Sequence, residues 1–101
     1  MLDTSNIPIE ELPEAMYNES MKSFEDALSL VYGCYEINME AVNATSEVFN
    51  DAIARKDYNE AFYDIRKLIS CVEELHKSCI RLQGVLYCKP KKPEKSNQIN
   101  P

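Results

Sequence analysis

Apolar side chains recur at seven-residue spacing along the first half of the chain. One series consists of Met21, Leu28, Tyr35, Val42 and Phe49. A second series, interleaved with the first, consists of Tyr17, Phe24, Val31, Asn38, Thr45 and Ala52. Two such series form a continuous stripe along one side of an α-helix. The pattern therefore predicts a long helix whose stripe packs against another helix.

The limits of this helix follow from proline and glycine. Pro13 suits the first position of a helix, and no other proline interrupts the heptad pattern that follows it. We therefore expect an extended leader over 1–12 and a first helix over about 13–56. The pattern contains a single glycine, Gly33. A bend or break there, which would give three shorter helices, is the main structural alternative, since a glycine inside a helix costs about 1 kcal/mol relative to alanine.

A second helix is predicted over about 58–87. Asp57, followed by Glu60 three residues later, has the spacing of a capping box at a helix start. The helix carries its own heptad series, which are Ile65, Val72, Cys79 and Leu86 in one and Ala61, Leu68, Leu75 and Leu82 in the other. The connection between the two helices has room for only about two to four residues, which makes the helices antiparallel. The segment 13–88 is therefore predicted to be an all-α helical hairpin, similar to a coiled coil. The proline- and lysine-rich segment 89–101 is predicted to be a disordered tail.

Folding the chain at the connection predicts which residues lie side by side. Their numbers should add to about 114, which gives the pairs Phe49 with Ile65, Val42 with Val72, Tyr35 with Cys79, and Leu28 with Leu86. The same register brings Asn38 close to His76. Asn38 and Thr45 are polar positions in the first stripe, where polar residues fix the register or the oligomeric state. A hydrogen bond to the second helix is the alternative role.

The hairpin leaves several apolar side chains without a partner within the chain. Three of them, Tyr17, Met21 and Phe24, are predicted to extend beyond the end of the second helix. Others flank the two stripes, namely Tyr32, Met39, Ile53, Ile69, Ile80 and Tyr87. Because two helices hide only one stripe each, we expect a second chain, identical or different, to complete a four-helix bundle. The candidate interface residues are Tyr17, Met21, Phe24, Tyr32, Met39, Ile80 and Tyr87.

Charge is distributed unevenly along the sequence. The net charge is -6, yet residues 1–54 carry eleven acidic residues and one lysine, while 55–101 carry ten basic and six acidic residues. The two halves are therefore complementary in charge, and we expect them to neutralise much of each other's charge when they pack together. A net acidic chain argues against nucleic-acid binding. With no signal peptide and no membrane span in the sequence, we expect a location in the cytoplasm or nucleus.

The cysteines and the single histidine are the candidates for chemistry. In a reducing compartment, Cys34, Cys71, Cys79 and Cys88 are expected to be free thiols that pack as small apolar residues. His76 allows a sharper hypothesis, either a phosphorelay histidine or a metal site with Cys71 and Cys79. The lysine and glycine that follow a phosphorelay histidine are replaced here by Cys79 and Ile80. A packing or hydrogen-bonding role for His76 is the simpler interpretation.

No catalytic motif accompanies the heptads, so the sequence predicts no enzyme, cofactor or metal. The two glycines are isolated and form no phosphate-binding loop. The function predicted from the sequence is a protein–protein interaction module, a small assembly or scaffold subunit of a larger helical complex. The alternatives are a self-contained three- or four-helix adaptor that binds a peptide in a groove, and a phosphorelay or metal module centred on His76.

Overall fold

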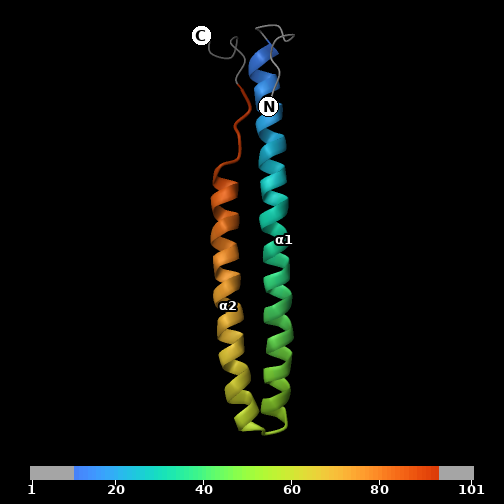
Figure 1. Ribbon diagram of the computed structural model, residues 1–101, viewed down its shortest axis with the longest axis vertical. Coiled ribbons are helices and arrows are strands. Elements are labelled where there is room, and N and C mark those ends of the chain that lie inside the picture. Colours follow the sequence, from blue (N-terminus) through green and yellow to red (C-terminus); the bar gives the residue numbers. More distant parts are fainter. Residues whose placement is uncertain (1–10, 94–101) are drawn as a thin grey trace, which may run out of the picture.

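The computed structural model describes residues 11–93 and consists of two antiparallel helices (Figure 1). Helix α1 spans Leu12–Ala54 with 43 residues, and helix α2 spans Tyr58–Tyr87 with 30 residues. The molecule is a single layer of helices, since its smallest dimension is 15 Å. The predicted all-α hairpin is confirmed. The predicted leader lies almost entirely outside the described residues, as does the predicted tail beyond Pro93.

Helix α1 passes through Gly33 without a break, so the alternative of three shorter helices is wrong. A methyl group added to the Gly33 Cα would have no neighbour within 4 Å, which shows that this position points away from α2. The glycine therefore affects only the intrinsic helix propensity. Tertiary packing of the turns before and after it keeps the helix continuous.

The connection between the helices is a Schellman motif followed directly by a helix cap. Lys56 has φ 60°, and its backbone N–H donates to the Ile53 carbonyl at 3.0 Å, while the Asp57 N–H donates to the Ala52 carbonyl at 2.9 Å. The Asp57 carboxylate accepts from the Glu60 N–H at 3.2 Å, which confirms the predicted cap. In a complete capping box the Glu60 side chain would accept from the Asp57 N–H. Here that N–H donates to the Ala52 carbonyl of the Schellman motif instead.

The predicted stripe of α1 is buried or half-buried along its whole length, but only one of the two stripe series predicted for α2 lies at the contact. Ala61, Leu68, Leu75 and Leu82 are at the contact as expected. The second series is wrong by one residue, because the contact contains Asp64, Cys71, Ser78 and Val85. Of the residues that the sequence predicted at these positions, Ile65 is half-buried, and Val72, Cys79 and Leu86 are exposed.

Hydrogen bonds across the contact establish the register. The Asn38 amide donates to the Ser78 hydroxyl and to the Glu74 carbonyl, the latter at 3.4 Å. The Thr45 hydroxyl lies 3.6 Å from the Cys71 sulfur and donates to the Ala41 carbonyl at 2.7 Å. Facing residues at these two positions therefore have numbers that add to 116, so the predicted sum of 114 is wrong, although Leu28 and Leu86 from the predicted pairs line the same groove.

The physical reason for this register is the amide of Asn38. A buried polar group left without a partner costs about 1–3 kcal/mol, and the observed rotation of α2 gives the half-buried amide nitrogen two acceptors on that helix. His76 is exposed and is not a partner of Asn38, in contrast to the expectation from the sequence. The interpretation of Asn38 as a residue that hydrogen-bonds to the second helix is confirmed.

Candidate interaction surface

The contact between the helices divides the hairpin into two long faces. On one side, a groove of about 750 Å³ is lined by residues of both helices, namely Glu25, Leu28, Ser29, Tyr32, Tyr35, Leu82 and Leu86. Residues seven positions apart lie on the same side of a helix that packs in this way. Tyr32 and Leu86 therefore identify which other residues share this side.

Large apolar side chains continue along this side for most of the length of α2. We call this surface the apolar face, and it consists of Tyr32, Met39 and Ile53 from α1 and Tyr58, Ile65, Val72 and Leu86 from α2. Exposed fractions reach 64% for Tyr58 and 54% for Leu86, and they are 48% for Tyr32 and 46% for Val72. Phe62 and Ile69, also exposed, extend the surface at its edge.

Two aromatic rings, those of Tyr32 and Tyr35, lie next to each other on the apolar face near the middle of α1. The ring centroids of Tyr32 and Tyr35 are 5.7 Å apart and tilted by 30°. This distance is within the range of favourable aromatic pairs. The pair forms one wall of the groove, and Leu82 and Leu86 form the other wall.

The opposite face has a different composition. From Asn38 toward the connection, its side chains at the contact are small or polar, and they include Asn38, Thr45, Asp64, Cys71 and Ser78. A cavity of about 150 Å³ on this side is lined by Ala44, Thr45, Val48, Asp64 and Lys67. Leu30 and Ile37 lie fourteen and seven residues before Ala44 and share this face, 75% and 67% exposed, and Val48 is exposed there as well.

Asp64 is the one buried ionisable residue of the described chain. It is 3% exposed, and its Oδ2 atom has no hydrogen-bond partner within residues 11–93. Lys67, one turn later, lines the same cavity, but its ammonium lies 5.4 Å from the centre of the Tyr63 ring. The loop end of the contact therefore contains a carboxylate without a compensating charge or hydrogen bond at that atom.

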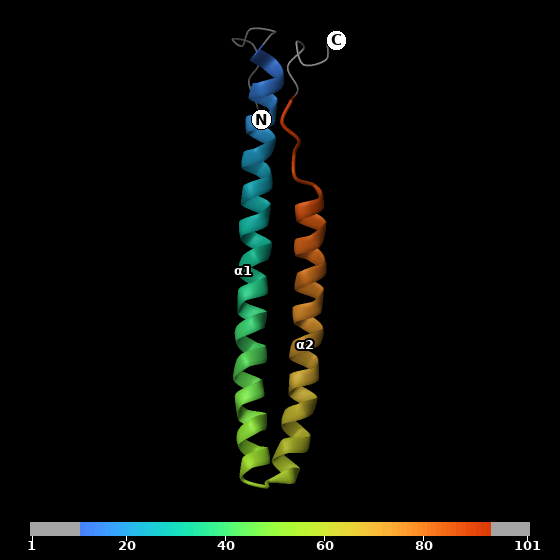
Figure 2. The same ribbon diagram turned by 180° about the vertical axis from the view of Figure 1, so that it is seen from behind.

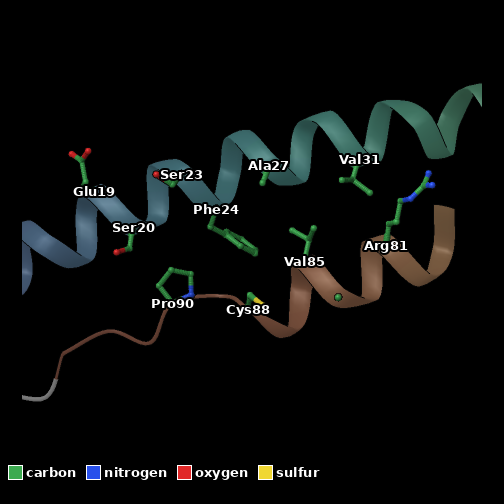
Figure 3. Close-up of a pocket in the computed structure, with 11 residues that line it drawn as sticks. Glu19, Ser20, Ser23, Phe24, Ala27, Val31, Arg81, Val85, Cys88 and Pro90 are labelled. Atoms are coloured by element: carbon green, nitrogen blue, oxygen red, sulfur yellow. The ribbon is translucent and has the colours of Figure 1, made fainter. Parts of the chain in front are cut away.

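At the other end of the hairpin, α1 extends past the end of α2 (Figures 1 and 2). The chain after Tyr87 runs alongside this extension. Phe24 points toward Val85, Cys88 and Pro90 across a groove of about 800 Å³ (Figure 3). The expectation that Phe24 has no partner within the chain is therefore wrong. Pro90, which follows the end of α2, lies beside the extension of α1 and lines this groove.

The predicted interface residues are distributed over several surfaces. Tyr32 and Met39 belong to the apolar face, while Tyr17 and Met21 are half-buried along the extension of α1. Ile80 and Tyr87 each follow a contact residue by two positions, which turns them about 200° away from α1. Tyr87 is 91% exposed. Contact of these residues with a partner stays a prediction.

His76, Cys71 and Cys79 are not assembled into a site. No group of three or more His, Cys, Asp or Glu side chains within residues 11–93 is arranged to hold a metal ion. His76 and Cys79 are exposed, and Cys71 lies beside Thr45. All four cysteines are free thiols, and Cys34, Cys79 and Cys88 are exposed, so the expectation that the cysteines pack as buried apolar residues fails for these three.

Comparison of the chain with protein-family models, with curated proteins and with solved structures found no match. Over residues 11–93, neither helix combines the length and the apolar character that crossing a bilayer requires.

Sequence reasoning missed several members of the apolar face. It assigned Ile65, Val72 and Leu86 to the contact between the helices and gave no role to Tyr58 or Phe62. The available signal was Asn38, whose amide needs a polar partner on α2. Ser78 satisfies this need, and choosing it rotates the neighbouring aliphatic residues onto the apolar face.

Proposed function

We propose that this chain is a non-enzymatic protein–protein interaction module, a small assembly or scaffold subunit that packs against other helices through its apolar face. The observation that supports the proposal is the location of the large apolar side chains. The fully or nearly fully buried residues within 11–93 are Ala52, Ala61, Asp64 and Ser78, whereas the aromatic and aliphatic residues of the apolar face remain partly exposed.

The energetic argument concerns the free energy of burying these side chains. Complete burial of a large apolar side chain is worth about 1.5–3 kcal/mol relative to exposure. Contiguous exposed apolar patches beyond a few hundred Å² are rare on monomeric proteins and mark interaction sites. The apolar face spans both helices, so a partner that covers it gains several such contributions at once.

The second candidate function is a peptide-binding adaptor, which the groove beside Phe24 and Pro90 favours. This groove is confined to the end of the hairpin where α2 stops (Figure 3). The apolar face, by contrast, follows most of the length of α2. A helical partner of similar length therefore fits the molecule better than a short peptide.

The test compares two pairs of substitutions in the full chain, tagged and expressed in its own cells. Tyr32→Glu/Val72→Glu places carboxylates on the apolar face, and Leu30→Glu/Ile37→Glu places them on the opposite face at more exposed positions. We expect the native assembly, sized by gel filtration, to be lost with the first pair and retained with the second. Equal behaviour of both pairs contradicts the proposal, provided that circular dichroism shows both variants to be helical.

A further inference from the structure

We propose that the occupant of the apolar face is a second copy of this chain, with the two hairpins packed face to face and their connections at the same end of a four-helix bundle. This inference rests on the proposed function and names its partner. It follows from the dimensions of the apolar face and from the unequal charges of the two helices.

The apolar face has the size that a stable dimer needs. Helix α2 has 30 residues, which gives a length of about 45 Å, and two adjacent helices are about 20 Å wide. The resulting area, roughly 800–900 Å², is comparable to the roughly 800 Å² that each partner buries in a standard interface. A second hairpin has the same length and width and covers the surface without overhang along α2.

A symmetric pair of hairpins has two possible arrangements. If the two-fold axis runs along the helices, α1 of one copy lies against α2 of its partner, and both connections are at the same end. If the axis is perpendicular to the helices, α1 lies against α1 of the partner and the connections are at opposite ends. The interface is self-complementary in either case, and charge decides between them.

Helix α1 is acidic and α2 is not. Within Leu12–Ala54 there are eight carboxylates and one lysine, a net charge of -7, whereas Tyr58–Tyr87 contains four acidic and four basic residues, a net charge of zero. Three lysines, Lys89, Lys91 and Lys92, follow α2. Placing α1 against α1 sets two charges of -7 side by side, and like charges across an interface are unfavourable.

The arrangement with both connections at one end removes this conflict. The register of 116 within one hairpin also applies between the copies, because the axis runs along the helices. Glu25, which lines the groove of the apolar face, then lies near the end of α2 in the other copy, which three lysines follow. The perpendicular arrangement instead sets Glu25 and Glu36 of one copy along the acidic α1 of the other.

The half-buried residues of the α1 extension agree with this geometry. Met21 precedes Leu28 by seven residues, and Leu28 lines the groove of the apolar face, so Met21 continues that face beyond the end of α2. With both connections at one end, the two extensions lie at the same opposite end. There the two Met21 side chains point toward the bundle axis.

The first measurement is the mass of the purified chain by light scattering. We expect twice the 11.6 kDa of one chain for the wild type and for Leu30→Glu/Ile37→Glu, and a single chain for Tyr32→Glu/Val72→Glu. A monomeric wild type overturns the inference, as does a dimer that the apolar-face pair leaves intact. If the wild type is monomeric but its native assembly depends on the apolar face, the proposed function stands and only the second copy is excluded.

The second measurement determines the arrangement. A spin label is attached to Asn59→Cys in a chain that carries Cys34→Ser, Cys71→Ala, Cys79→Ser and Cys88→Ser, after circular dichroism and light scattering have shown the fold and mass of the wild type. Two labels beside connections at the same end should be less than about 40 Å apart. A distance near the length of α1, about 65 Å for 43 residues, contradicts the inference.

Discussion

The two faces of the hairpin use the same helices for different purposes. On the opposite face, small and polar residues meet across the contact, where Asn38 bonds Ser78 and Thr45 lies beside Cys71. On the apolar face, Tyr32, Val72 and Leu86 are large and partly exposed. The difference shows that the polar groups determine how the two helices meet, while the large apolar groups stay partly exposed beside the contact.

Packing geometry explains why the small residues lie at the contact. The distance between two helices depends on the side chains between them, and small side chains allow a close approach. Two helices also leave solvent on both sides of their contact, so a large residue there is at best half-buried. Ser78 and Ala52 are fully covered because they are small.

The largest effect is expected from a substitution that fills the contact. Ser78→Leu adds two heavy atoms at a fully buried position, which should lower the free energy of unfolding by about 1–3 kcal/mol, as overpacking does elsewhere. Cys79→Leu is the matched control, since its side chain is exposed. Thermal denaturation of both variants checks the register. A larger loss for Cys79→Leu than for Ser78→Leu means that α2 is rotated as the heptad count first suggested.

The next effect has the opposite sign. Asp64→Ala removes a buried carboxylate whose Oδ2 atom has no partner, and we expect the free energy of unfolding to rise by about 1–3 kcal/mol. Chemical denaturation measures this change.

Asp51→Ala is the control for Asp64→Ala, because Asp51 is exposed and bonds Arg55 at 2.8 Å on the surface. We expect no resolvable change in melting temperature from this substitution. The Asp51 carboxylate raises the pKa of Arg55, and the stability from a raised pKa is fully present below the ordinary pKa of the group and is lost only as the pH rises above it. The pair therefore adds no pH dependence near neutrality.

A loss of stability in Asp64→Ala means that the Asp64 carboxylate has a partner in solution.

A double-mutant cycle sharpens the comparison at the Asn38–Ser78 pair. Asn38→Ala should cost about 1 kcal/mol, because it leaves the buried Ser78 hydroxyl without its donor. The double variant Asn38→Ala/Ser78→Ala should lose less free energy of unfolding than the two single variants lose together, since both polar groups are then absent. Strict additivity of the melting data excludes coupling between the two residues.

The smallest effect is expected at the connection, which belongs to neither face. Lys56 adopts φ 60°, a conformation that glycine adopts at no steric cost. Lys56→Gly should raise the free energy of unfolding by about 0.5–1 kcal/mol, with the apolar face unchanged. Lys56→Ala keeps the side-chain penalty and serves as the control. A destabilised glycine variant means that the lysine side chain itself supports the turn.

Local rules predicted the elements from the sequence, but they did not predict how α2 is rotated. Pro13, Asp57 and the uninterrupted heptads of α1 each act within one helix, and the limits and the hairpin follow from them. The choice between Ser78 and Cys79 depends on Asn38, forty residues away. Counting apolar residues favours Cys79 and Val72, whereas hydrogen bonding favours Ser78 and Cys71. The left-handed Lys56 was also not expected, because lysine rarely adopts that conformation.

The small size of the fully buried side chains has a consequence for the abundance of the protein in a cell. Only two alanines, a serine and an aspartate are fully or nearly fully buried, and a hairpin that leaves its large side chains half-buried gains little stability from them. If the proposed partner binds only the folded form, it adds stability by mass action, and the fraction of folded chains then depends on concentration. Under that proposal, copies made in excess of the partner would unfold more often and be removed by proteolysis, so that assembly would adjust the amount of the protein.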